Sequence, residues 1–201
     1  MAEEMMRLPG ATTIGMICRD GVILASEKRV SYGYFVLSKA GKKVFKITDS
    51  VGAACAGLVS DMQMLIREVG AYSSLYQLEN SRPISVKSVA KVMATLLFQR
   101  RLFPLFTQTI VGGVDESGPS LYILDPLGSL IPDKYASVGS GAEIATGILE
   151  SDYKDGMSME EARNLVIRAV KSATARDVSS GNGLDLLLIT KSEAKEENIP
   201  P

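Results

Sequence analysis

The sequence predicts an α+β fold, and three observations point to it. Short strand-like segments alternate with pairs of helix-like segments along the 201 residues. Glycine and proline turn signals bound the strands, and no internal repeat or linker divides the chain. With 46% hydrophobic and 22% charged residues, the chain can bury one sizeable core. Runs of strands between helix pairs favour two sheets packed face to face with helices outside both, a four-layer sandwich.

The first third of the chain predicts about five strands. Their ranges are 13–18, 22–27, 34–38, 44–48 and 51–57. Asp20-Gly21 is a strong signal for a two-residue turn, so the first two strands should form a β-hairpin. Ala40-Gly41 lies between the next two, which predicts a second hairpin.

Four later segments carry apolar residues at helical spacing. They cover residues 59–79, 85–102, 141–152 and 159–175. Ser158 and Glu161 add a capping-box pattern to the last of these. Further strand-like segments cover residues 107–115, 120–125, 134–139 and 184–190. The charged residues 191–201 predict a solvated tail.

The absence of histidine restricts the chemistry more than any other count. It excludes a Ser-His-Asp triad, a Cys-His pair and histidine-based zinc sites. A hydrolase of this composition must pair a hydroxyl with a lysine, an amine or a carboxylate. The net charge of −1 gives no electrostatic case for nucleic acid or an acidic membrane surface as a partner.

Several features favour the cytoplasm. Residues 1–10 contain two acids and no apolar core, so they do not have the pattern of a secretory signal. No window has the length and apolarity of a membrane-spanning helix. Cys18 and Cys55 lie in apolar strand-like segments, which is typical of buried thiols in a reducing compartment.

Six short motifs occur in order over about 180 residues. They are Gly10-Ala11-Thr12-Thr13-Ile14-Gly15, Asp20 to Ala25 with Glu27-Lys28-Arg29, Gly41 to Phe45, Ala56 to Asp61, Ser137 to Gly141, and Arg176 to Gly181. Together they resemble the β-type subunits of the 20S proteasome, threonine proteases with the N-terminal-nucleophile hydrolase fold. One such motif is a weak signal, whereas six in register are a strong one. The short segment before Ala11 and the Glu27 pattern resemble archaeal members of the family.

The resemblance implies an αββα sandwich with a propeptide, residues 1–10, a β-subunit domain, residues 11–190, and the charged tail, residues 191–201. In the family, cleavage after the position of Gly10 frees a new N-terminal threonine. The threonine hydroxyl is the nucleophile and its own α-amine is the base. Such a mechanism needs no histidine.

The resemblance also assigns roles around the nucleophile. Lys43 would lower the pKa of the hydroxyl with its positive charge. Glu27 would orient Lys43, Arg29 would support the acidic cluster, and the Gly57 backbone N–H would stabilise the oxyanion. Three residues would surround the amine and the hydroxyl: Ser140, Asp177 and Ser180.

Taken without the resemblance, these residues have ordinary interpretations. Glu27 to Arg29 would be a charged strand end, and Lys42-Lys43 a solvated turn. Ser140 between two glycines would be a helix cap. Only the joint register of the six motifs favours the catalytic interpretation.

The resemblance further implies unfolded polypeptides as substrates and neither a metal nor an organic cofactor. The substrate-binding S1 pocket would be lined by Val30, Ser31, Phe45, Cys55 and Val59. This lining is mostly apolar and uncharged, so we expect cleavage after hydrophobic residues. The implied partners are α subunits and other β subunits in four stacked seven-membered rings, and indirectly a gating or unfolding ATPase.

Apolar residues on more than one face of the predicted helices 59–79 and 85–102 independently predict assembly with other subunits. Tyr72, Leu75 and Tyr76 extend the apolar stripe of the first helix. The apolar stripe of the second helix is extended by Phe98, Leu102, Phe103 and Phe106. Exposed apolar surface of this kind usually marks an interface, and ring symmetry repeats each contact.

Ala11 departs from the family because a methyl group is no nucleophile. The hydroxyl is also needed to cut after Gly10, so we expect the propeptide to stay attached. Thr12 should not replace it, since a shift of one residue along a strand turns the side chain to the opposite face.

Two explanations remain open: an engineered Thr→Ala change, or a natural non-catalytic β subunit. The otherwise intact site favours the first. A third possibility, the simpler bacterial two-ring relative, is disfavoured by the Arg176 to Gly181 motif.

Overall fold

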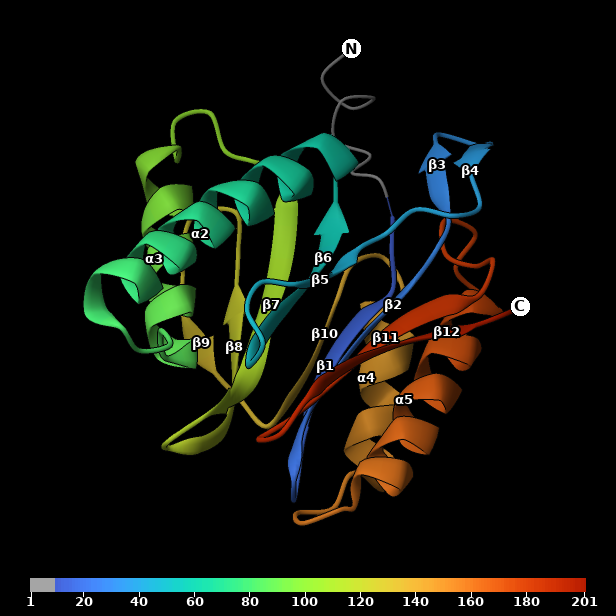
Figure 1. Ribbon diagram of the computed structural model, residues 1–201. Coiled ribbons are helices and arrows are strands. Elements are labelled where there is room, and N and C mark those ends of the chain that lie inside the picture. Colours follow the sequence, from blue (N-terminus) through green and yellow to red (C-terminus); the bar gives the residue numbers. More distant parts are fainter. Residues whose placement is uncertain (1–9) are drawn as a thin grey trace.

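The structure is a computed structural model that describes residues 10–201, and it forms four layers (Figure 1). One five-stranded sheet has the order β10-β1-β2-β11-β12, and the other has the order β5-β6-β7-β8-β9. All pairings are antiparallel, which confirms the predicted class. The first sheet comprises β1 Thr13–Cys18, β2 Gly21–Glu27, β10 Tyr135–Val138, β11 Leu184–Thr190 and β12 Ala194–Ile199. The second comprises β5 Val44–Lys46, β6 Val51–Gly57, β7 Thr107–Asp115, β8 Gly118–Leu124 and β9 Ile131–Pro132.

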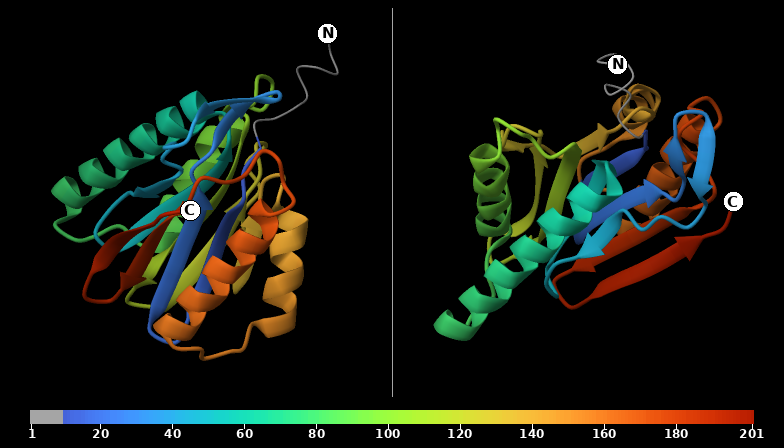
Figure 2. Two further views of the ribbon diagram at one scale, coloured as in Figure 1. Left: turned by 90° about the vertical axis from the view of Figure 1, so that its right-hand side faces the viewer. Right: turned by 90° about the horizontal axis from the view of Figure 1, so that it is seen from above.

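Helices cover the outer face of each sheet. They are α2 Val59–Asn80, α3 Val86–Gln99, α4 Ala142–Asp152 and α5 Met159–Thr174. In both views of Figure 2, the α2–α3 pair and the α4–α5 pair lie on opposite sides of the two sheets. The capping box predicted at Ser158 and Glu161 is present at the start of α5. Within residues 10–201, no helix is long and apolar enough to cross a bilayer.

Three apolar clusters fill the spaces between the layers. Ile23 of β2 packs toward α4 and α5, whereas its neighbour Leu24 lies between the two sheets. On β6, Ala53 packs toward α2 and α3, and Ala54 lies between the sheets. Successive strand residues point to opposite faces, so one strand serves two clusters. Both sheets are thus buried on both sides, as the four-layer sandwich requires.

The first predicted hairpin is confirmed, but the second is wrong. β1 and β2 pair directly, whereas β4 (Phe35–Ser38) pairs with β3 (Val30–Tyr32). Gly33 allows this tight turn because its φ of 57° is in the left-handed region. β5 pairs instead with β6, where Val44 opposite Ala54 joins the core between the sheets. Burial of Val44 in the core favours this β5–β6 hairpin over the predicted hairpin between residues 34–38 and 44–48.

The predicted solvated tail is also wrong, because residues 194–199 form β12. This strand pairs with β11 from Leu184↔Ile199 to Ile189↔Ala194. Its charged side chains are compatible with an edge strand, where charge discourages pairing with other chains. Glu197 of this strand accepts a hydrogen bond from Arg163 Nε of α5 at 2.8 Å. This bond links β12 to α5.

Candidate active site

Residues 10 to 12 lead into β1 and are buried between other elements. Ala11 belongs to the cluster between the sheets, together with Val44 and Ala56, the chain neighbours of Lys43 and Gly57. A side chain at position 10 would collide with Ser140 and Ser179, so only glycine fits there.

A buried ion pair joins two of the predicted residues. Lys43 is 2% exposed and Glu27 is fully buried, and Lys43 Nζ donates to Glu27 Oε1. Lys43 Nζ also donates to the Arg29 carbonyl oxygen at 2.6 Å. The second oxygen of Glu27 accepts from the backbone N–H groups of Arg29, at 2.6 Å, and Gly181, at 2.9 Å. These contacts hold Lys43 against Glu27 in this structure.

Burial shifts the pKa of both partners. It lowers the pKa of Lys43 and raises that of Glu27, and in each case the charge of the partner opposes the shift. The solvated-turn interpretation of Lys42-Lys43 fits only Lys42, which is exposed and pairs with Glu196 at 3.0 Å.

The variant Lys43→Met should destabilise the fold more at high pH than at low pH. It leaves the Glu27 carboxylate buried without its cation, at a cost of about 3–5 kcal/mol. Loss of Lys43 should raise the already raised pKa of Glu27 further. A carboxyl with a raised folded pKa stabilises the fold below its unfolded pKa, and this stability is lost as the pH rises through the folded pKa. Thermal unfolding should therefore show a larger loss at about pH 8 than at about pH 5. Adding Glu27→Gln should remove the pH dependence, and an equal loss at both pH values in Lys43→Met alone would contradict the expectation.

A second cluster surrounds the backbone of Ala11. Ser140 Oγ and Ser180 Oγ both donate to Asp177 Oδ2, at 2.6 and 2.5 Å. Ser179 N donates to Asp177 Oδ1 at 3.1 Å. Ser140 Oγ also lies 3.4 Å from the Ala11 carbonyl oxygen. The structure thus brings together Ser140, Asp177 and Ser180 beside position 11.

Two glycines shape the same region. Gly57 ends β6 with a φ of 137°, and a Cβ there would collide with the Phe106 carbonyl. Gly139 has a φ of 98°, and a Cβ there would collide with the Ala11 carbonyl. L-residues rarely adopt such backbone angles, so both positions require glycine. Gly139 lies within the Ser137 to Gly141 motif, but the sequence alone predicted no role for it.

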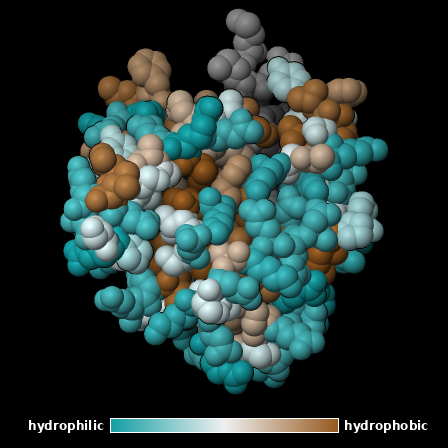
Figure 3. Space-filling view, in the orientation of Figure 1, coloured by the Kyte–Doolittle hydropathy of each residue, from teal (hydrophilic) through white to brown (hydrophobic). Residues whose placement is uncertain are grey.

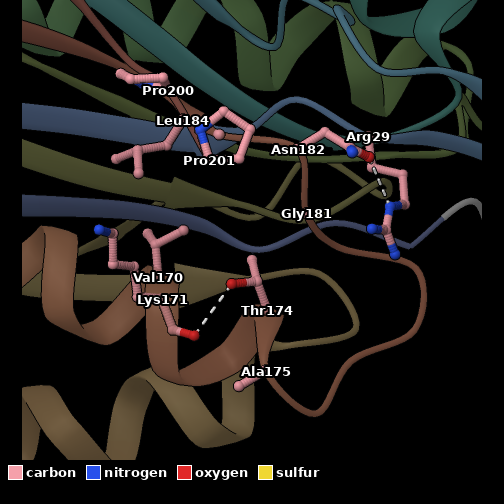
Figure 4. Close-up of a pocket in the computed structure, with 11 residues that line it drawn as sticks. Arg29, Val170, Lys171, Thr174, Ala175, Gly181, Asn182, Leu184, Pro200 and Pro201 are labelled. Carbon is pink, nitrogen blue, oxygen red and sulfur yellow. Dashed lines mark hydrogen bonds between the residues drawn. The ribbon is translucent and has the colours of Figure 1, made fainter.

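Arg29 ties the loop after α5 to this region. Its NH1 donates to the Val178 carbonyl at 2.7 Å, and its Nε donates to Asn182 Oδ1 at 2.9 Å. Figure 4 shows Arg29 and Asn182 facing each other at a pocket of about 470 Å³. Asn182 was missed in the sequence because a polar residue between glycines carries no distinguishing pattern.

The five residues expected to bind substrate do not share one environment. Val30, Ser31, Phe45 and Val59 are partly exposed. Cys55 differs, because it is fully buried and its sulfur accepts from Thr109 Oγ1 at 3.6 Å. Burial raises the pKa of this thiol to about 12, so it stays neutral and unreactive. In this structure Cys55 offers no surface to a ligand. Among residues 10–201, no group of three potential metal-ligating side chains is positioned to hold an ion.

The four-layer sandwich agrees with the predicted N-terminal-nucleophile hydrolase fold. The family described as "Proteasome subunit" matches residues 8–189, and the chain belongs to this family. Similar proteins include "Proteasome subunit beta 2" of Pyrobaculum arsenaticum, 46% identical over 99% of this chain and 97% of the relative. "Proteasome subunit beta 1" of Nitrosopumilus maritimus is 49% identical over 95% of this chain and 96% of the relative. The corresponding subunit of Cenarchaeum symbiosum is 50% identical over 94% and 97%.

These relatives are archaeal β subunits matched over almost their full length, so the predicted family is confirmed. The chain has the role of a β subunit of the proteasome core particle, which assembles with other proteasome subunits in rings. β subunits of this family are usually threonine peptidases.

Proposed function

We propose that this chain is an endopeptidase subunit that is inactive as written because Ala11 occupies the nucleophile position. One observation carries the proposal. The Glu27–Lys43 pair and the Asp177 cluster are both formed, although residue 11 has no hydroxyl. Retention of a buried ion pair is costly without a function, which supports a catalytic ancestry for the site.

With threonine at position 11, the proposed reaction begins with attack of its hydroxyl oxygen on the substrate carbonyl. The α-amine of the same residue accepts the hydroxyl proton. Lys43 stabilises the developing alkoxide with its positive charge, and Glu27 keeps Lys43 in place. The Gly57 N–H donates to the oxyanion. The α-amine must be free, so cleavage after Gly10 precedes turnover.

The Asp177 cluster would hold the α-amine of residue 11. Asp177 supplies a negative charge close to that amine, and Ser140 and Ser180 fix the carboxylate through their hydroxyls. Ala11 cannot cut the chain after Gly10, so residues 1–10 would remain attached as a propeptide.

Thr12 does not fit the role of a replacement nucleophile. Its hydroxyl lies 2.8 Å from Ser180 Oγ and makes a hydrogen bond there. The alternating faces of an extended chain account for this difference from Ala11.

A second candidate function is that of a non-catalytic β subunit needed for ring assembly, and Ala11 itself favours it. A peptidase assay of assembled particles carrying Ala11→Thr distinguishes the two. A structural subunit stays inactive after the substitution, whereas a disabled peptidase regains activity.

The proposed substrates are unfolded polypeptides inside an enclosed chamber in the cytoplasm, and no cofactor takes part. Four partly exposed residues, Val30, Ser31, Phe45 and Val59, are the proposed S1 lining and favour cleavage after hydrophobic residues. The proposed assembly has two inner β rings and two outer α rings of seven subunits each, served indirectly by an unfolding ATPase.

The chain should assemble with an α-type partner and aggregate or be unstable without it. On the α2–α3 side, Tyr72 and Phe98 are about half exposed, and Leu102 and Phe103 are 82% and 89% exposed. Figure 3 shows hydrophobic patches among the hydrophilic surface of the face drawn in Figure 1. Apolar surface of this kind is buried in an oligomer. Light scattering after co-expression with an α subunit should detect a ring assembly of high mass. A soluble 21.5 kDa monomer in the presence of that partner would rule the assembly out.

A further inference from the structure

Thr12 is a buried hydroxyl residue outside the roles described above. It has no exposed surface, and its Oγ1 lies 2.8 Å from Ser180 Oγ. The two residues are 168 positions apart in the chain. A buried hydroxyl is costly unless it makes a hydrogen bond, so this contact fixes where the Thr12 side chain points.

Counting hydrogens gives the direction of the bond. Each hydroxyl carries one hydrogen. Ser180 Oγ lies 2.5 Å from Asp177 Oδ2, and a carboxylate can only accept, so the Ser180 hydrogen is committed to Asp177. Thr12 must therefore donate to Ser180. The result is a chain of donors that runs from Thr12 through Ser180 to Asp177.

The neighbouring backbone is shaped around the Thr12 hydroxyl. A Cβ at position 141 would collide with Thr12 Oγ1. Gly141 has a φ of −89°, which any residue can adopt, so glycine is needed there for space and not for conformation. Gly141 N also donates to the Ala11 carbonyl oxygen at 3.2 Å. The same glycine thus makes room for Thr12 and holds the backbone of position 11.

The next residue provides a contrast. Thr13 is equally buried, but its hydroxyl lies 2.8 Å from Ser26 Oγ and donates to the Cys55 carbonyl at 3.0 Å. Its hydrogen bonds do not reach Asp177 or its two serines. Two adjacent buried threonines therefore serve different parts of the structure.

We propose that Thr12 is a positioning residue for the peptidase reaction, an inference that rests on the proposed function. The hydrogen bond from Thr12 occupies one lone pair of Ser180 Oγ and so fixes the rotation of the Ser180 hydroxyl. The hydroxyl hydrogen of Ser180 then points at Asp177. A hydroxyl that receives a hydrogen bond becomes a stronger donor, which strengthens the bond to the carboxylate. The carboxylate then has one orientation beside the α-amine of residue 11. The Thr12 side chain takes no part in the bond-making steps and acts through Ser180.

Steady-state kinetics of assembled particles in the Ala11→Thr background test this role. Thr12→Val keeps the shape of the side chain but removes the hydroxyl, and it should lower kcat by about tenfold or more. KM should stay within about twofold, because Thr12 does not contact substrate. Thr12→Ser retains the hydroxyl and should restore most of the lost kcat.

The matched control is Thr13→Val, which removes a neighbouring buried hydroxyl. Both Thr13→Val and Thr12→Val should lower the unfolding temperature, but Thr13→Val should leave kcat within about twofold. If Thr12→Val does not assemble, Thr12→Ala takes its place, since a smaller side chain cannot overpack the site.

The outcomes separate this inference from the proposed function. An inactive Ala11→Thr particle with intact Thr12 overturns both. An active Ala11→Thr particle whose kcat is unchanged by Thr12→Val or Thr12→Ala overturns the role of Thr12 alone. That role is also overturned if Thr12→Ser loses as much kcat as Thr12→Val.

Discussion

Ala11→Thr is expected to turn the chain into a self-processing peptidase. The substitution supplies the one missing group to a site in which Lys43 and Asp177 are already held by hydrogen bonds. The new hydroxyl should first cut the chain after Gly10 and then hydrolyse peptides. Peptide hydrolysis by the assembled particle should rise at least about a thousandfold, because removal of a nucleophile costs at least that much in comparable enzymes.

Intact-mass measurement and a peptidase assay check this result together. The mass should fall by that of residues 1–10, and a chain that still begins at Met1 would count against the prediction. Ala11→Val is the matched control, because valine has the shape of threonine without the hydroxyl. It should assemble, remain uncut and stay inactive. Activity in Ala11→Val would mean that position 11 is not the nucleophile.

The sequence predicted the layers well but missed two pairings between consecutive strands. Near-continuous apolar runs predicted β1, β2 and β11, because strands that are buried on both faces carry such runs. Local pattern could not reveal that β5 pairs with β6, or that the charged segment 194–199 becomes β12. Both pairings depend on partners that the strand's own residues do not specify.

The proposed catalytic cluster illustrates the same limit at the level of side chains. Lys42 and Lys43 are identical neighbours, yet one is solvent-exposed and the other is buried against Glu27. Only the family resemblance distinguished them. Thr12 was considered solely as a substitute nucleophile, because its bond to Ser180 joins opposite ends of the chain and leaves no local signal.

Lys43→Met is expected to abolish the activity that Ala11→Thr restores. Without the positive charge, the pKa of the nucleophilic hydroxyl rises, and each unit of that rise costs about 1.4 kcal/mol. We expect a loss of at least about a hundredfold in kcat. Lys42→Met is the matched control, since Lys42 is exposed and pairs with the exposed Glu196. Its kcat should stay within about twofold of the parent.

Stability must be separated from chemistry in this experiment. Lys43→Met leaves the buried Glu27 carboxylate without its cation. Unfolding alone would then also abolish activity. The double variant Lys43→Met with Glu27→Gln removes the unpaired charge and should recover most of the unfolding temperature. It should remain inactive, because a neutral amide beside a methionine supplies no positive charge to the hydroxyl. If the double variant hydrolyses peptides at the parent rate, Lys43 serves only the fold, and the proposed activation of the nucleophile is wrong.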